Sequence, residues 1–232
     1  MNTKLSVIIP AHNEENYIKK TLHSLKNQTF QNFETIIVSN GCSDRTEEIV
    51  QKRENERLKQ ISISEANVSI ARNRGAQEAL GETLVFLDAD TTLEENALQK
   101  INQEFTEKYV VGTTLSSPDI NSFRYKIVTG FKNFHNTVGF YEGCSGVLIC
   151  RKEDFSQVGG YDPKIIVKEH RKLNVKLRRK TNKKFRCIKT TAVTSMRRYK
   201  EWGVMKASWF WIKQWFKNYT GKIKESKYEK VR

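Results

Sequence analysis

The sequence lacks the features that mark a membrane-spanning or secreted protein. No stretch reaches the roughly 18 consecutive apolar residues that suggest a transmembrane helix. The apolar run near the start is too short for a signal peptide, because Lys4 and the polar residues from His12 onward bracket it. The four cysteines show neither CxxC spacing nor a histidine partner at metal-ligand spacing: Cys42, Cys144, Cys150 and Cys187. We therefore expect reduced thiols and a cytoplasmic location.

Proline and low-complexity sequence are also scarce. The chain has only three prolines, no biased segment and no internal repeat, which argues against long disordered linkers. A length of 232 residues, with 38% hydrophobic and 29% charged side chains, fits one large globular domain, or one domain with an appendage.

Positive charge is concentrated in the last third of the chain. Residues 1–150 hold 16 Lys and Arg against 19 Asp and Glu, a net charge of −3. Residues 151–232 hold 25 against 7, a net charge of +18. This asymmetry predicts that the C-terminal part meets an anionic partner such as lipid headgroups, phosphates or nucleic acid. A solvated basic surface is the alternative.

Strand and helix patterns alternate through the first 90 residues. The expected strands are Leu5–Ile9 (ended by Pro10), Thr35–Val38, Ile61–Ile63 and Thr83–Leu87. The expected helices are Glu15–Asn27, one capped by Ser43 or Asp44, and one that starts at Ser69 and stops at Gly81 in a left-handed turn. Such alternation predicts an α/β fold with a Rossmann-like, mostly parallel sheet flanked by helices.

Polar residues follow three of these strands. They form the segments Pro10–Glu14, Ser39–Asp44 and Asp88–Asp90. Because ligands bind beyond the carboxyl ends of the strands in such sheets, we expect one polar crevice there. Asp88 and Asp90 leave a buried strand two residues apart, and a divalent cation that holds a diphosphate needs such hard oxygen ligands. An acidic turn after a strand is the alternative.

The second half of the chain is less regular. We expect an aromatic-rich helix over Phe123–Phe140, a strand over Ser145–Ile149 and a basic helix over Glu169–Lys180 with Leu173 and Leu177 as its apolar stripe. Two short strands are expected at Phe185–Ile188 and Ala192–Ser195.

The last expected element is an amphipathic helix over Glu201–Tyr219, followed by a basic tail. Its apolar face covers about half of the cylinder and includes four tryptophans: Trp202, Trp209, Trp211 and Trp215. Lysine beside tryptophan is typical of a helix that lies in a membrane interface. The alternative is a helix that packs on its own domain or on a second subunit, in a homo-oligomer.

Five motifs, in this order and spacing, resemble the family 2 glycosyltransferases. They are Ser6–Glu14, Ile37–Thr46, Ala71–Ala76, Leu87–Thr91, and Gly159–Asp162 with Glu169. The resemblance covers about residues 4–200 and implies an inverting enzyme with an A-type nucleotide-sugar fold. It implies a transferase domain over residues 1–200, with a nucleotide-sugar half over 1–110 and an acceptor half over 111–200. Residues 201–232 are then the helix and tail.

The resemblance also implies roles for individual residues. The donor, a UDP- or GDP-sugar, would lie against Pro10, Ala11, Asn13, Glu14, Ser39, Asn40, Asp44, Arg72, Asp88 and Ala89. Pro10 would rigidify the turn after the first strand, and Arg72 would offer charge-assisted hydrogen bonds to the diphosphate. Asp90, with Asp88, would ligate Mg²⁺ or Mn²⁺. Small residues would line the cleft for the sugar and the acceptor: Gly143, Cys144 and Ser145.

The sequence departs from the family pattern at two places. Glu169 occupies the first position of the acidic motif that supplies the catalytic base, but His170 stands where a second acid is expected. We expect Glu169 to be the base, with His170 as the alternative. Ser39 stands where many relatives have an aspartate that recognises uracil, which leaves uracil and guanine both open.

Three functions compete at this point. The first is metal-dependent transfer of a sugar to a hydroxyl or phosphate acceptor, either free or polyprenyl-linked at the inner face of the membrane. The second is a nucleotidyltransferase, although Pro10–Glu14 has neither the glycine nor the lysine of its usual loop. The third is a basic nucleic-acid-binding module, for which the sequence shows no signature motif.

Overall fold

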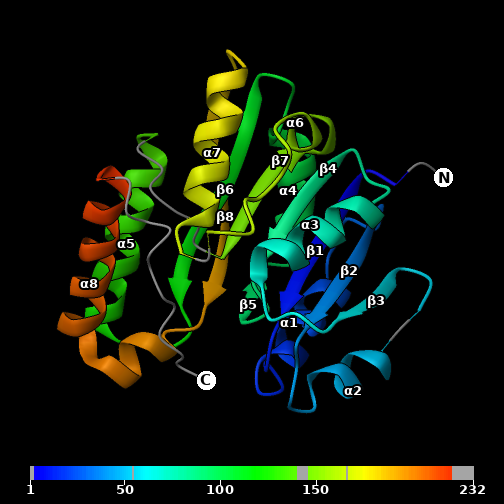
Figure 1. Ribbon diagram of the computed structural model, residues 1–232, viewed down its shortest axis with the longest axis horizontal. Helices are drawn as coiled ribbons and strands as arrows, with labels where there is room; N and C mark the ends of the chain where they lie inside the picture. The colour runs from blue at the N-terminus through cyan, green and yellow to red at the C-terminus, as the bar shows by residue number, and fades with distance from the viewer. Residues whose placement is uncertain (1–2, 54, 140–145, 166, 221–232) are drawn as a thin grey trace.

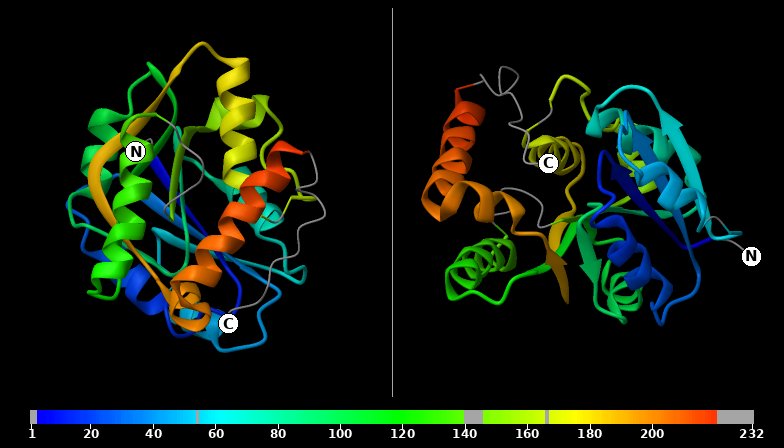
Figure 2. Two further views of the ribbon diagram at one scale, coloured as in Figure 1. Left: turned by 90° about the vertical axis from the view of Figure 1, so that its left-hand side faces the viewer. Right: turned by 90° about the horizontal axis from the view of Figure 1, so that it is seen from below.

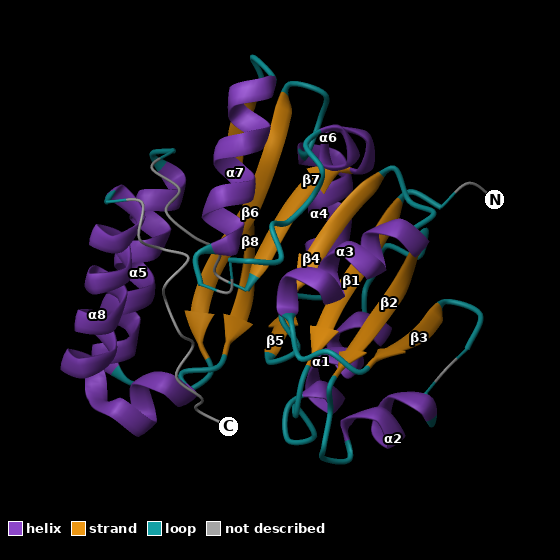
Figure 3. Ribbon diagram, viewed as in Figure 1, coloured by secondary structure: helices purple, strands orange, loops and turns teal. Residues whose placement is uncertain are grey.

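The fold is built on one mixed sheet with helices on both faces. A computed structural model describes residues 3–53, 55–139, 146–165 and 167–220. Eight strands form the sheet in the order β3-β2-β1-β4-β7-β6-β8-β5. The first four are parallel to one another, β7 is antiparallel to its neighbours, and β6 and β8 are again parallel (Figure 1, Figure 3). The predicted Rossmann-like α/β arrangement is confirmed.

The elements of the first half alternate as predicted. They are β1 (Leu5–Ala11), α1 (Ile18–Lys26), β2 (Phe33–Asn40), α2 (Thr46–Gln51), β3 (Leu58–Ile63), α3 (Val68–Glu78), β4 (Thr83–Leu87), β5 (Thr91–Leu93) and α4 (Ala97–Glu104). The second half holds β6 (Tyr109–Pro118), α5 (Phe123–Thr137), β7 (Val147–Arg151), α6 (Lys152–Gln157), α7 (Glu169–Lys180), β8 (Lys184–Thr194) and α8 (Arg197–Tyr219).

Successive side chains of the central strand β1 point to opposite faces of the sheet, so the core has two parts. Val7 and Ile9 pack with α1 and α4 in one buried cluster, whereas Ile8 packs with α3, α6 and α7 in the other. Both faces of the central strands are therefore covered, as an interior parallel sheet requires. A third, smaller cluster joins the start of α8 to α5 beside β6.

Two expectations about the first half are wrong. Pro10 does not end the first strand: β1 continues to Ala11, and Pro10 pairs with Val38. Because β4 pairs with β1 only as far as Ile8, Pro10 has a strand neighbour on one side, a position in which proline is tolerated. Helix α3 ends at Glu78, before Gly81, which is not in a left-handed conformation.

Gly81 is needed for a different reason, which is close packing. A Cβ atom there would lie 2.7 Å from the carbonyl carbon of Leu5. The expected start of this helix at Ser69 was one residue late: α3 begins at Val68, and the side chain of its cap Asn67 accepts hydrogen bonds from the backbone of Ser69 and Ile70.

Two expectations about the second half are also wrong. The two short strands expected near 185 and 192 are one strand, β8, because the pairing with β6 jumps from Ile188 to Thr191 at a bulge. The last helix begins at Arg197, not Glu201, and Gly203 breaks it with a left-handed φ of 76°. A short first segment is therefore joined to the long helix that was predicted.

Candidate active site

The loops after β1 and β2 are joined by hydrogen bonds at the carboxyl edge of the sheet. The Asn13 side chain accepts a hydrogen bond of 2.8 Å from the backbone of Ser43. The Thr46 hydroxyl accepts one of 2.7 Å from the backbone of Glu14. Asp44 accepts one from the backbone of Glu15. The two predicted donor loops therefore form one rigid unit.

Asp44, one residue before the N-cap residue Arg45, also contacts the start of α2. Its carboxylate accepts a hydrogen bond of 2.9 Å from the backbone of Thr46, the first helical residue. Partial burial acts to raise the pKa of Asp44, but the hydrogen bonds from Thr46 and Glu15 outweigh it, and the pKa lies below its ordinary value. Asp44 is thus held ionised at the mouth of the loop.

Two of the predicted donor residues point into the protein. Ser39 is fully buried and its hydroxyl accepts a hydrogen bond from Gln60. Asn40 is also buried, and its amide donates to the carbonyl of Ala11. Asn40 therefore joins the end of β2 to β1, and Ser39 joins it to β3.

Arg72 joins the two sequence regions that were expected to carry the chemistry. Its side chain is 3% exposed, and its guanidinium lies 2.8 Å from the carboxylate of Asp88 and 2.7 Å from that of Glu169. Asp88 follows β4, and Glu169 is the first residue of α7. A buried guanidinium with two carboxylates is a rigid connection, because separating either pair would leave an uncompensated charge.

The residue after Arg72 connects α3 to the Gly159–Asp162 segment. Asn73 accepts a hydrogen bond of 2.9 Å from the backbone of Tyr161 and donates one of 2.9 Å to the Tyr161 carbonyl. Gly160 must be glycine here, because its φ is 62° and a Cβ would lie 2.6 Å from the Asn73 side chain. Two of the sequence motifs thus interlock.

His170 lies behind Glu169. Its side chain is buried, and its Nδ1 shares a hydrogen bond of 2.8 Å with the Tyr161 hydroxyl. Burial lowers the pKa of His170 well below its ordinary value, and the charge of Arg72 lowers it further. His170 is therefore a neutral, packed side chain, whereas Glu169 stands nearer the surface.

Arg197 belongs, with Ser195 and Arg198, to a segment that resembles a basic segment of the family, which could close over the diphosphate. It is the first residue of α8, and its guanidinium donates two hydrogen bonds of 2.8 Å to Glu14. It also lies 2.9 Å from the Asp90 carboxylate and stacks over Tyr17. The signal for Arg197 in the sequence is the polar and basic character of the Ser195–Arg198 segment, which directly follows strand β8.

Part of the expected cleft lies outside the described residues. Gly143, Cys144 and Ser145 belong to that part of the chain. The adjoining Gly146 is described, with a φ of 86° and a backbone carbonyl that accepts a hydrogen bond from Asp88. A Cβ on Gly146 would lie 2.4 Å from the Thr91 hydroxyl, so the backbone approaches the acidic loop closely.

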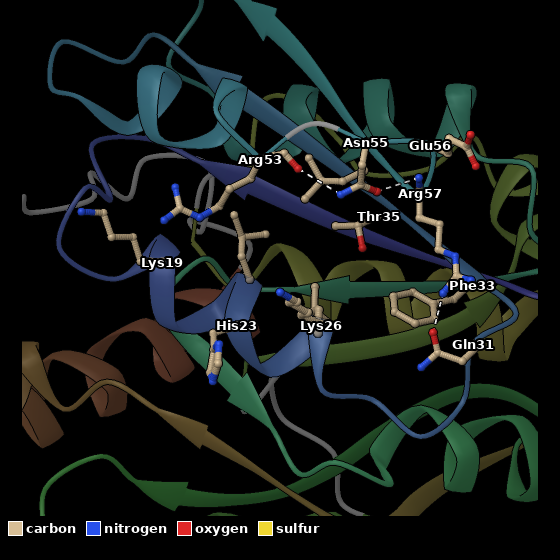
Figure 4. Close-up of a pocket in the computed structure, with 13 residues that line it drawn as sticks. Lys19, His23, Lys26, Gln31, Phe33, Thr35, Arg53, Asn55, Glu56 and Arg57 are labelled. Atoms are coloured by element: carbon tan, nitrogen blue, oxygen red, sulfur yellow. Dashed lines mark hydrogen bonds between the residues drawn. The ribbon is translucent and has the colours of Figure 1, made fainter.

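The structure also has a cavity of 750 Å³ that is not the predicted crevice (Figure 4). It is lined by Phe33 and Leu58, the first residues of β2 and β3, and by residues of α1. It therefore lies toward the amino ends of these strands, away from Asp88 and Asp90.

The tryptophans expected to meet lipid have different positions. Trp202 and Trp211 are half-buried and pack on Met196, Tyr199 and Ala207. Trp209 is 64% exposed. The side chain of Trp215 lies outside the described part of α8. None of the described helices is long and apolar enough to cross a bilayer.

Comparison with known proteins identifies the family of the chain. The model of "Glycosyl transferase family 2" matches residues 6–150. The chain belongs to this family, which confirms the resemblance seen in its motifs.

Two relatives give the level of similarity. The chain is 27% identical to the glycosyltransferase GlyA of Streptococcus pneumoniae over 61% of its own length and 22% of the relative's. It is 33% identical to the GalNAc(5)-diNAcBac-PP-undecaprenol beta-1,3-glucosyltransferase of Campylobacter jejuni, over 46% of its length and 36% of the relative's. The chain therefore matches well under half of either protein.

Solved structures share the fold at low sequence identity. TarS of Staphylococcus aureus, residues 1–349 in complex with UDP, aligns with a TM-score of 0.64 at 19% identity, over 88% of this chain and 64% of that one. The mannosyltransferase PcManGT of Pyrobaculum calidifontis, in complex with GDP-Man and Mn²⁺, aligns with a TM-score of 0.71 at 15% identity, over 92% and 65%. The predicted A-type fold is confirmed.

Proposed function

We propose that this protein is an inverting glycosyltransferase that moves a sugar from a nucleoside-diphosphate sugar to an acceptor. The observation that carries the proposal is the shared guanidinium of Arg72, which holds Asp88 and Glu169 within 2.8 Å of its nitrogens. Asp88 belongs to the acidic donor loop, and Glu169 is the candidate base. The buried Arg72 guanidinium thus fixes the acidic donor loop and the candidate base relative to each other.

The donor would lie at the carboxyl edge of the sheet, over the joined loops after β1 and β2. Asn13, Glu14, Asp44 and the Asp88–Asp90 segment border this region. TarS and PcManGT are solved with UDP and with GDP-Man, so both bases stay in the proposal. Ser39 is buried, so it contributes through the backbone position that it fixes.

A divalent cation, Mg²⁺ or Mn²⁺, fits the donor set of the acidic loop. Asp88 and Asp90 supply carboxylate oxygens. No cluster of three or more Asp, Glu, His or Cys side chains among the described residues could hold a metal alone. Oxygens from the diphosphate and water would complete the ligand set, as is usual for Mg²⁺. When bound, the cation neutralises the charge of the departing nucleoside diphosphate.

Glu169 would accept the proton of the acceptor hydroxyl as that oxygen attacks the anomeric carbon from the face opposite the diphosphate. Arg72 keeps the Glu169 carboxylate in place, and His170 and Tyr161 fill the space behind it. Arg197 supplies a second positive charge at Glu14 and Asp90, where the diphosphate would lie.

The acceptor is proposed to be a lipid-linked sugar or polyprenyl phosphate, with the protein at the inner surface of the membrane. One relative is named for a transfer to an undecaprenol-linked acceptor, and the C-terminal third carries a net charge of +18. Basic segments of this kind are attracted to anionic headgroups.

The test is a panel of UDP- and GDP-sugars with Mn²⁺ or Mg²⁺, in which the nucleotide product is identified. We expect release of a nucleoside diphosphate, stopped by EDTA. Release of pyrophosphate would instead indicate a nucleotidyltransferase. Turnover that EDTA does not change would contradict the metal-dependent mechanism.

A further inference from the structure

Among the described residues, two neighbouring helices carry most of the exposed large apolar side chains. On α5 they recur three or four residues apart and are between 49% and 79% exposed: Phe123, Ile127, Phe131, Phe134 and Val138, the C-cap. On α8 they follow the same spacing and are between 45% and 87% exposed: Met205, Trp209, Ile212 and Phe216. Such spacing places each set along one stripe of its helix.

These stripes lie opposite the sides on which the helices pack. On α5, Thr129 and Asn136 are buried, and Asn133 binds the backbone of Ser116 on β6. On α8, Ala207 and Gln214 are buried. The stripes are therefore not part of the protein's own core. Patches of exposed apolar side chains on this scale mark interaction surfaces.

The two helices form one end of the molecule. They lie side by side beyond β6 and β8 at the left of Figure 1, and Figure 2, left, looks onto them. Tyr125 of α5 and Tyr199 of α8 belong to the same small cluster, with ring centroids 6.3 Å apart. We refer to the exposed stripes of α5 and α8 together as the two-helix surface.

The positive charge on these helices favours an anionic binding partner over a second copy of the chain. Helix α5 carries Arg124, Lys126 and Lys132 and no acid, and α8 carries six Lys and Arg against the single acid Glu201. A second copy of the chain, related by a twofold axis, would bring this cationic set against itself. Anionic headgroups would complement it, while the apolar stripes enter the acyl boundary.

We propose that the two-helix surface is a membrane-docking surface for anionic lipid bilayers, with α5 contributing as much as α8. The inference deepens the proposed membrane-side function and rests on it. It also relates the position of the membrane to that of the reaction site. The stripe on α8 starts at Met205, eight residues after Arg197, which contacts Glu14 and Asp90. A lipid-linked acceptor would therefore meet the reaction site at the end of the docked helix.

Co-sedimentation with vesicles tests the surface. The full chain is mixed with vesicles of phosphatidylcholine alone and of phosphatidylcholine with phosphatidylglycerol, at low and high salt. We expect binding only to the anionic vesicles, weakened by salt. The double variants Phe131→Ser/Phe134→Ser and Trp209→Ser/Ile212→Ser should each lower the affinity by at least about tenfold.

Leu80 provides the matched control. It is 70% exposed but lies between α3 and β4, away from the two-helix surface. Leu80→Ser should bind vesicles as the wild type does. Because all these side chains are exposed, the melting temperatures should stay close to wild type. Nucleoside diphosphate release in lipid-free solution should also be unchanged, which separates this inference from the transfer chemistry.

Three results would overturn the proposal. One is binding that neither double variant reduces. Another is equal binding to neutral and anionic vesicles. The third is a stable dimer in sedimentation equilibrium that Phe131→Ser/Phe134→Ser dissociates, since a second copy would then be the occupant. Lost vesicle binding with intact donor turnover would count against this surface and not against the glycosyltransferase activity.

Discussion

The guanidinium of Arg197 lies 2.9 Å from the carboxylate of Asp90. Asp90 was expected to ligate the metal, and Arg197 begins the helix that carries half of the proposed docking surface. The same guanidinium is paired with Glu14, whose side chain is only 4% exposed. Arg197 thus holds positive charge at the acidic loop in this structure, in the place where the cation is proposed to act.

Replacing Arg197 should therefore uncover buried negative charge. We expect Arg197→Gln to lower the free energy of unfolding by about 3 kcal/mol, because the buried Glu14 carboxylate loses its ion pair with the Arg197 guanidinium. Mn²⁺ should then raise the melting temperature of the variant more than that of the wild type. Thermal melts with and without Mn²⁺ measure both effects.

Arg45→Gln is the control for that experiment, because Arg45 pairs with Glu15 at the surface and its side chain is 76% exposed. Exposed pairs contribute little, so its melting temperature should not change. If Arg197→Gln melts at the same temperature as Arg45→Gln, the Glu14–Arg197 pair does not stabilise the site.

The choice of base predicts unequal effects at two adjacent residues. Glu169→Gln keeps an oxygen for Arg72 but cannot accept a proton, so the transfer kcat should fall by about 10²- to 10⁴-fold. His170→Gln should lower it by less than about tenfold, because His170 is packed behind the site. Steady-state transfer assays and donor titrations separate kcat from binding. A larger effect at His170 would reverse the assignment.

The neutral, buried His170 predicts an acid-side loss of stability. Its pKa in the folded protein lies well below the ordinary 6.5. The unfolded chain therefore binds a proton, as the pH falls below about 6.5, that the folded chain does not bind. The free energy of unfolding should decrease by up to about 1.4 kcal/mol per pH unit as the pH falls from this value toward the folded pKa.

Urea denaturation of the wild type and of His170→Gln between neutral and mildly acid pH measures that loss. The variant should show a shallower dependence on pH in this window. Equal slopes would mean that folding does not lower the pKa of His170.

Close packing of α3 on the sheet gives a stability prediction with an internal control. A Cβ on Gly75 would lie 2.5 Å from a methyl group of Ile8, whereas one on Gly130 of α5 would meet nothing within 4 Å. We expect Gly75→Ala to lower the free energy of unfolding by about 1–3 kcal/mol. Gly130→Ala should raise it by up to about 1 kcal/mol, because alanine has the higher helix propensity. Chemical denaturation gives both values, and a neutral Gly75→Ala would contradict the described packing.

Local patterns were sufficient for some elements in both halves of the fold. The strand Thr83–Leu87 and the helix Glu169–Lys180 have the bounds that the sequence predicted. Both are marked by strong signals, an apolar run in the first and a regular Leu173–Leu177 stripe in the second. Element β6 was missed because Thr113, Thr114 and Ser116 interrupt its apolar pattern, although all three are buried.

The site was only partly predictable, because its ion pairs join residues far apart in the chain. The motifs indicated Arg72, Asp88 and Glu169 individually, but their mutual contacts depend on where α3 and α7 pack. Arg72 was expected to contact the diphosphate, whereas it is buried between the two carboxylates. Arg197 is 107 residues from Asp90 in sequence, and no local pattern relates them.

The most direct test of the central claim is a Mn²⁺ titration with UDP or GDP present, followed by electron paramagnetic resonance. The central claim is that the Asp88–Asp90 loop holds a cation together with a nucleoside diphosphate. Wild type and Glu95→Gln, which changes an exposed carboxylate five residues further on, should bind Mn²⁺ equally. Asp90→Asn should weaken binding by at least about tenfold. Unchanged Mn²⁺ binding by a folded Asp90→Asn protein would contradict the account.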